Sequence, residues 1–120
     1  MPQVLVVDDE PSLLRLFQFY LEVDIKAEVF TERDGKAALE TFRSNRALDL
    51  VVLDLTLPDV SGVEVLEEIL RYNPQTRVII CSALKPEHYP KELVSVAKAF
   101  LTKPFDRKTF VGQVRTVLAE

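Results

Sequence analysis

The sequence contains one cysteine, one histidine, three glycines and no tryptophan among its 120 residues. The single cysteine, Cys81, excludes a disulfide within the chain, and its place in an apolar run predicts a buried, reduced thiol in a cytoplasmic protein. The few glycines do not form a phosphate-binding glycine loop. The only histidine, His88, lies in a polar, proline-flanked stretch, which indicates an exposed side chain rather than a phosphotransfer residue.

No apolar run approaches the roughly 20 residues that a membrane helix needs, and the first residues lack the basic start of a signal peptide. The formal net charge of −4 argues against nucleic acid as a direct partner, because contacts with phosphates need a basic surface. The 48% hydrophobic and 28% charged content is typical of an ordinary globular protein. A chain of this length fits one domain, which we expect to span residues 1–120.

Five short apolar runs alternate with segments of helical periodicity, and they cover residues 4–7, 27–30, 50–53, 78–81 and 99–101. Four of them are continuously apolar, as is expected of parallel strands covered on both faces. The run at 27–30 alternates and leaves Glu28 free to point outward, which predicts an edge strand. Strands that alternate with helices predict a doubly wound α/β domain, with a five-stranded parallel sheet and helices on both faces.

Local signals mark the helices between the runs. The predicted starts are Pro11, Asp34-Gly35, the capping-box pair Ser61 and Glu64, and the cap Asp106. The residues predicted to face inward are Leu14, Phe17, Leu21, Ala38, Leu39, Phe42, Leu66, Ile69, Leu70, Phe110, Val114 and Val117.

Two prolines, Pro86 and Pro90, fall where the fourth helix should begin. Proline lacks the amide that a helix interior needs, so we predict that the chain after Ser82 is irregular. A short helix should begin near Pro90 and end by about Lys98. Its candidate inward residues are Leu93, Val94 and Ala97.

Charged and hydroxyl side chains follow four of the five runs. Residues 8–10, Asp-Asp-Glu, come directly after the first run, and Asp54 comes after the third. Ser82 follows the fourth run, and Lys103 lies two positions beyond the fifth. Because doubly wound sheets bind ligands outside the carboxyl ends of their strands, we expect these side chains to lie together.

Their chemistry fits phosphoryl transfer onto a carboxylate. Asp8, Asp9 and Asp54 would repel one another, and magnesium relieves such repulsion by binding a few carboxylates while it keeps several waters. A carboxylate can attack phosphorus to give an acyl phosphate, whose oxygens Lys103 and Ser82 could then contact. Each residue alone also has a structural explanation, such as a helix-dipole partner or a turn former. Their coincidence at four strand ends favours a site.

The segments VLVVDDEP, LVVLDLTLPDVSG, VIICSA and FLTKPF resemble the four signature blocks of the response-regulator receiver family of two-component signalling. The resemblance covers nearly the whole chain. It implies a flavodoxin-like sheet with strand order 2-1-3-4-5. It also implies a cytoplasmic signalling switch that depends on Mg²⁺ and catalyses phosphoryl transfer to itself.

The resemblance implies a role for each matching residue. Asp54 would be the phosphoacceptor, with Lys103 and Ser82 as the groups that contact the phosphoryl group. The metal ligands would be Asp9, Asp54, the backbone carbonyl of Thr56 and, through water, Asp8. Ser82 and Phe100 would form the switch, and the Lys103-Pro104 peptide would be cis.

The implied donor is the phosphohistidine of a sensor histidine kinase or a histidine phosphotransfer protein. The implied output is a downstream effector domain or protein, reached through the face formed by the fourth helix, fifth strand and fifth helix. Two alternatives remain. A phosphohydrolase of the haloacid dehalogenase type would carry a second aspartate where this chain has Thr56, and a receiver that is never phosphorylated would be expected to lose an acidic residue or the lysine.

Overall fold

The computed structural model describes residues 1–120 and contains a five-stranded sheet with the order β2-β1-β3-β4-β5, in which every neighbouring pair is parallel. The strands are β1 (Gln3–Val7), β2 (Glu28–Glu32), β3 (Leu50–Asp54), β4 (Val78–Ser82) and β5 (Ala99–Thr102). The helices are α1 (Pro11–Tyr20), α2 (Gly35–Ser44), α3 (Gly62–Tyr72), α4 (Lys91–Val96) and α5 (Arg107–Leu118). The predicted doubly wound, flavodoxin-like fold is confirmed. None of its helices is long and apolar enough to cross a lipid bilayer.

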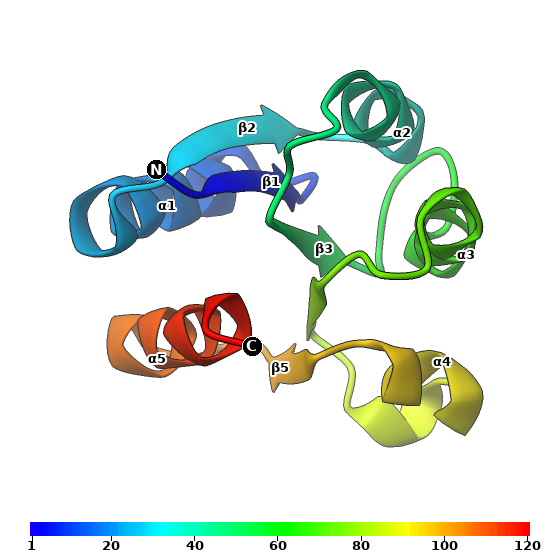
Figure 1. Cartoon of the computed structure of the whole chain (residues 1–120). Helices are drawn as coiled ribbons and strands as arrows, with labels where there is room; N and C mark the ends of the chain where they lie inside the picture. Colours follow the sequence, from blue (N-terminus) through cyan, green and yellow to red (C-terminus); the bar gives the residue numbers. More distant parts are fainter.

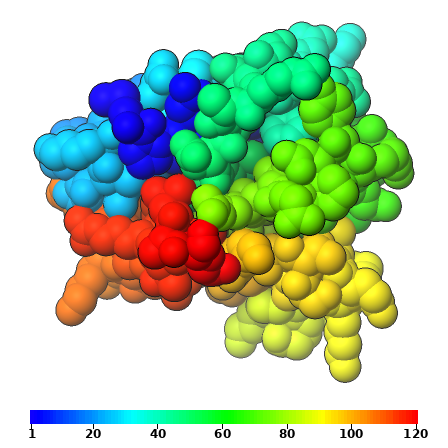
Figure 2. Space-filling model, in the orientation of Figure 1, coloured from blue at the N-terminus to red at the C-terminus, as the bar shows by residue number.

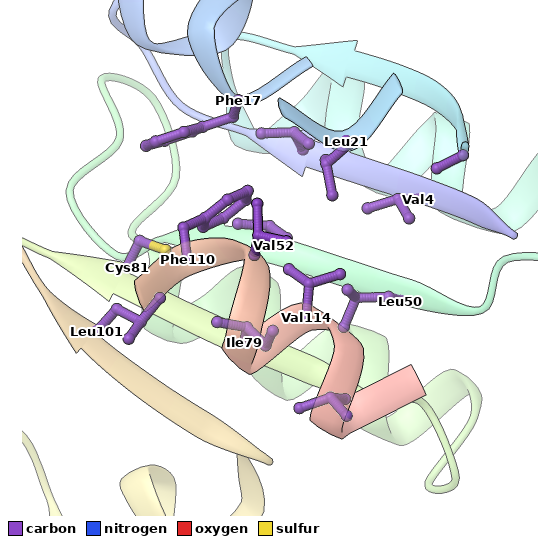
Figure 3. Close-up of a cluster of buried hydrophobic side chains, with 14 of the residues drawn as sticks. Val4, Phe17, Leu21, Leu50, Val52, Ile79, Cys81, Leu101, Phe110 and Val114 are labelled. Carbon is purple, nitrogen blue, oxygen red and sulfur yellow. The ribbon is translucent and has the colours of Figure 1, made fainter. Parts of the chain in front are cut away.

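Helices α1 and α5 cover one face of the sheet, and α2, α3 and α4 cover the other (Figure 1). Alternate residues of a strand point to opposite faces, so Val4 packs in the cluster with α1 and α5 while Leu5 packs in the cluster with α2 and α3. In the first cluster the rings of Phe17 and Phe110 stack with centroids 4.9 Å apart (Figure 3). Cys81 lies in the same cluster, and burial raises the pKa of its thiol. The prediction of a buried cysteine is therefore confirmed.

The strands differ from their predicted ranges by one or two residues. Strand β2 lies at an edge of the sheet with Glu28 exposed, as predicted, but it runs to Glu32 rather than to residue 30. Its pairing with β1 continues to Val7, which keeps the strand extended beyond the apolar run. Strands β3 and β4 each include one further residue, so Asp54 and Ser82 are the last residues of their strands.

Side chains cap three helices at their predicted starts. The Asp34 carboxylate accepts a hydrogen bond from the Ala37 amide at 2.8 Å, and the Ser61 hydroxyl accepts one from the Glu64 amide at 3.2 Å. The Asp106 carboxylate accepts one from the Thr109 amide at 2.8 Å. Ten of the twelve residues predicted to face inward are buried, and the exceptions, Leu39 and Leu70, are half-buried at the margin of the second cluster.

The segment between β4 and β5 follows the proline-based prediction. Residues 83–85 are irregular, Pro86–His88 form one 3₁₀ turn, and α4 begins at Lys91 with Pro90 at its N-cap. The helix ends at Val96 after six residues. Leu93 and Ala97 pack against the second cluster, whereas Val94 lies outside that cluster because it faces the 3₁₀ turn across a surface hollow. The yellow-green and yellow part of Figure 2 shows this segment projecting at one corner of the molecule.

Candidate functional site at the carboxyl edge of the sheet

The sheet register brings the predicted site residues to one edge. Val7 pairs with Leu53 in the neighbouring strand, so Asp8 and Asp54 follow at the same level. On the other side of β3, Ser82 pairs with Thr102, which places Lys103 one residue beyond. These residues come from segments up to 95 positions apart, and the parallel register is what makes them neighbours.

Three carboxylates form the centre of the site. One oxygen from each of Asp8, Asp9 and Asp54 lies within 4.8 Å of the others. Asp8 is 1% exposed and Asp54 is 5% exposed, while Asp9 is half-buried. Backbone amides fix two of them: Glu10 donates to Asp8 Oδ1 at 3.0 Å, and Thr56 donates to Asp54 Oδ1 at 2.9 Å.

The side chain of Lys103 supplies the positive charge. Its Nζ donates to Asp8 Oδ2 at 2.7 Å and to Asp54 Oδ2 at 3.1 Å. The Lys103 amide donates to the Ser82 carbonyl at 2.7 Å, which extends the strand pairing to the site. The Lys103-Pro104 peptide bond is cis, as predicted.

For both Asp54 and Lys103, burial and the neighbouring charges shift the pKa in opposite directions. Burial raises the pKa of Asp54, and the hydrogen bond from Thr56 and the charge of Lys103 offset this only in part. Burial alone would lower the pKa of Lys103, but its hydrogen bond to Asp8 and the charges of Asp54 and Asp8 outweigh that effect and raise it. Lys103 therefore stays cationic at neutral pH.

Ser82 reaches this edge, but its hydroxyl has partners outside the acidic cluster. Ser82 Oγ lies 2.8 Å from the Tyr89 hydroxyl and accepts a hydrogen bond from the Leu84 amide at 3.1 Å. The ring of Tyr89 lies next to that of Phe100, with centroids 6.0 Å apart. Sequence reasoning missed Tyr89. Its only signal was its position as the aromatic residue between Pro86 and Pro90, and that position does not show where the ring points.

A second missed residue, Asp59, ties the loop after β3 to helix α2. Its carboxylate accepts hydrogen bonds from the amides of Gly35 at 2.8 Å and Lys36 at 3.1 Å. The amide hydrogen bonds of Gly35 and Val60 are the main reasons why the pKa of Asp59 is lowered to about 2. The contact spans 24 positions, so no local pattern could have indicated it.

The loop after β3 also approaches the strand very closely at Gly62. A Cβ atom there would lie 2.2 Å from Leu55 Cα and 2.7 Å from the Asp54 carbonyl oxygen. The Gly62 amide donates to the Leu55 carbonyl at 3.0 Å. Glycine is required here because any side chain would push the backbone that carries Asp54.

The donor set suits a hard divalent cation. Three carboxylates from two strand ends can each turn an oxygen to one point, and oxygen ligands are those that magnesium prefers. The half-buried Lys103 ammonium group beside them is not a ligand but balances part of their charge. The residues present therefore fit Mg²⁺. The Thr56 carbonyl as a further ligand stays a prediction.

Residues 4–115 match the model of a sequence family described as "Response regulator receiver domain". The chain belongs to this family. The response regulator receiver domain is 38% identical over 120 residues to the response regulator ArlR of Staphylococcus saprophyticus, an alignment that covers 98% of this chain and 53% of ArlR. It is 34% identical over 118 residues to the chemotaxis protein CheY of Treponema pallidum, covering 97% of this chain and 82% of CheY.

A solved structure gives a similar result. The response regulator TrrA of Thermotoga maritima, solved in complex with Mg²⁺-BeF, superimposes on this receiver domain with a TM-score of 0.87 and 30% identity, covering 98% of this chain and 99% of TrrA. TrrA has also been solved in complex with the histidine kinase ThkA. The chain spans about half the length of the ArlR relatives that it matches.

Proposed function

We propose that residues 1–120 form a receiver domain that accepts a phosphoryl group on Asp54 and acts as a switch in two-component signalling. The observation that carries this proposal is the position of the Asp54 carboxylate. It ends a central strand, it is almost fully buried, and it lies 3.1 Å from the Lys103 ammonium group beside two further carboxylates. A buried carboxylate with a cation and an acidic cluster around it is suited to hold a phosphoryl group.

The chain's own groups have distinct parts in the transfer. An oxygen of Asp54 forms the new bond to phosphorus while the bond between phosphorus and the donor breaks, and the product is an acyl phosphate. The Lys103 ammonium group, which now bridges Asp8 and Asp54, is close enough to turn to a phosphoryl oxygen. Ser82 offers a hydroxyl group at the same edge of the sheet, as the last residue of the neighbouring strand β4.

Asp9 and Asp54 would hold a magnesium ion directly, with the Thr56 carbonyl as a third ligand and Asp8 through water. When bound, the ion would supply charge neutralisation for the carboxylates and the phosphoryl oxygens. The three carboxylates within 4.8 Å of one another support this assignment. The Mg²⁺-BeF complex of the similar TrrA structure supports it independently.

The donor in this proposal is the phosphohistidine of a sensor kinase or a histidine phosphotransfer protein. The complex of TrrA with the histidine kinase ThkA supports a partner of this kind. The output is an effector domain or protein that recognises a repacked face of α4, β5 and α5. Support comes from α4, which has only six residues and none of them buried, so little packing opposes its movement.

The domain assists its own phosphorylation rather than turning over a separate substrate. The receiver fold differs from that of haloacid dehalogenase phosphohydrolases, and Thr56 stands where their second aspartate would be. The Thr56 side chain is exposed and cannot act as a general acid at neutral pH.

Acetyl phosphate with magnesium tests the assignment. The wild-type domain should gain one phosphoryl group by intact-mass spectrometry, and Asp54→Asn should gain none. Asp49→Asn is the matched control because Asp49 precedes the opposite end of the same strand, where it accepts a hydrogen bond from the Gln3 amide. Labelling of Asp54→Asn to the extent of the control would reject Asp54 as the acceptor.

A further inference from the structure

The hydroxyl of Ser82 is fully buried and has two partners, neither of which belongs to the acidic cluster. The Leu84 amide donates to Ser82 Oγ at 3.1 Å, and the Tyr89 hydroxyl lies 2.8 Å from the same atom. A serine hydroxyl has one hydrogen and two lone pairs. With the Leu84 amide on one lone pair, the bond to Tyr89 takes either the other lone pair or the hydrogen.

The position of Tyr89 makes this bond a link between the sheet and a loosely held segment. Tyr89 lies between a 3₁₀ turn and Pro90, which has no amide to donate. Its own amide donates to the Pro86 carbonyl within the same segment, at 3.0 Å. The side-chain bond to Ser82 is therefore a contact that fixes the segment to strand β4.

Phe100 cannot make the same bond, since phenylalanine has no hydroxyl. Its ring instead lies 6.0 Å from that of Tyr89, tilted by 47°. Both rings are half-buried and pack against the second cluster, the one that includes residues of α2 and α3. Any movement of Tyr89 changes the space next to Phe100.

We propose that Tyr89 is a positioning residue that holds the Ser82 hydroxyl on the α4 side of the sheet until a phosphoryl group on Asp54 draws it away. A phosphoryl oxygen offers no hydrogen, so Ser82 must donate its own and turn toward Asp54. That movement breaks the bond to Tyr89 and releases residues 83–90 together with α4. The inference rests on the proposed phosphorylation of Asp54 and adds a residue that opposes it.

The substitution Tyr89→Phe tests this proposal because it removes one oxygen atom and keeps the ring beside Phe100. Because Ser82 then has one hydrogen bond fewer to break, the affinity of the variant for beryllofluoride in the presence of magnesium should increase by about two- to tenfold, as measured by calorimetry. The rate at which acetyl phosphate labels the variant should also rise. Tyr72→Phe is the control, since that ring packs edge-on against Phe42 on another part of the surface.

A double-mutant comparison separates a link to Ser82 from a general effect on the fold. In the Ser82→Ala background Tyr89→Phe should change neither the affinity nor the rate, because the hydroxyl that Tyr89 holds is gone. The same gain in both backgrounds would overturn the proposal. So would an unchanged or weaker affinity in the single variant Tyr89→Phe.

Amide exchange supplies a readout that does not depend on phosphorylation. In Tyr89→Phe without any phosphoryl donor, the amides of residues 83–93 should exchange faster than in the wild type and in Tyr72→Phe. Equal exchange rates would show that the bond does not hold the segment, and the proposal would fall. Should the wild type take up no label at all, the proposed function of Asp54 fails instead, and the two failures are thereby distinguished.

Discussion

Lys103 and Asp8 are 95 positions apart in the sequence, and their side chains form an ion pair in which Nζ lies 2.7 Å from Oδ2. Both side chains are largely shielded from water, with 16% and 2% of their surfaces exposed. The same ammonium group lies 3.1 Å from Asp54, so one cation balances two carboxylates. The Lys103 ammonium group thus links Asp8 and Asp54, and these contacts must rearrange when a metal ion or a phosphoryl group binds.

Lys103→Met should lower the free energy of unfolding by roughly 3 kcal/mol, since it leaves two buried carboxylates without their partner. Magnesium should recover part of this loss, because the ion supplies the missing positive charge. Urea unfolding with and without magnesium measures both effects. Lys108→Met, at an exposed position of α5, is the control, and an equal loss in the two variants would show that the ion pair is not responsible.

Magnesium without any phosphoryl donor should stabilise the wild-type domain, because only the folded chain gathers the three carboxylates. At ten times the dissociation constant the gain is about 1.4 kcal/mol, or roughly 4–6 °C in Tm. Asp9→Asn should respond far less in differential scanning fluorimetry, whereas Asp49→Asn should respond like the wild type. An identical shift in Asp9→Asn would place the ion elsewhere.

Gly62→Ala should destabilise the domain by roughly 1–3 kcal/mol and slow the labelling of Asp54. Its new methyl group would meet the Leu55 backbone at 2.2 Å, and the backbone cannot yield without moving the end of β3. Gly112 offers an internal comparison, because a Cβ atom there meets nothing within 4 Å. Gly112→Ala in helix α5 should stabilise by about 0.5–1 kcal/mol. Thermal unfolding that places the two alanine variants at the same Tm would contradict this account of the loop.

The anchoring of α2 by Asp59 should give a defined pH dependence. The pKa of Asp59 is about 2 in the folded protein, against 3.8 for an ordinary aspartate. Its stabilisation is therefore fully present above pH 4 and is lost as the pH falls toward 2. The stability difference between wild type and Asp59→Asn, followed by urea unfolding at several pH values, should shrink over this range. A difference that is constant from pH 7 to pH 2 would mean that the charge of Asp59 makes no contribution.

The sequence predicted the fold and the site residues because both depend on features that a chain displays locally. Apolar runs indicate buried strands, and the rule that ligands bind at carboxyl strand ends brings Asp8, Asp54 and Lys103 together. The partner of the Ser82 hydroxyl depends instead on the path of a segment between two prolines. The contact of Asp59 with α2 depends on how one loop packs against a distant helix. Periodic sequence patterns indicate neither the Ser82 contact nor the Asp59 contact.

Contacts beyond the local sequence also explain two smaller errors, the end of β2 and the orientation of Val94. Strand β2 runs two residues beyond its apolar run because pairing with β1 continues there. Val94 was predicted to face inward from its position in a short helix, but a helix of six residues has too few turns for periodicity to fix its orientation.

Direct location of the phosphoryl group on the chain tests whether Asp54 is the acceptor. Borohydride reduces an aspartyl phosphate to homoserine, so the domain can be treated with acetyl phosphate and magnesium, reduced, digested and analysed by tandem mass spectrometry. Homoserine is expected at position 54 and at no other aspartate position, and none should form when magnesium is removed by a chelator. Homoserine at position 8 or 9 would contradict this assignment. So would a protein that gains one phosphoryl group but contains no homoserine at position 54 after reduction.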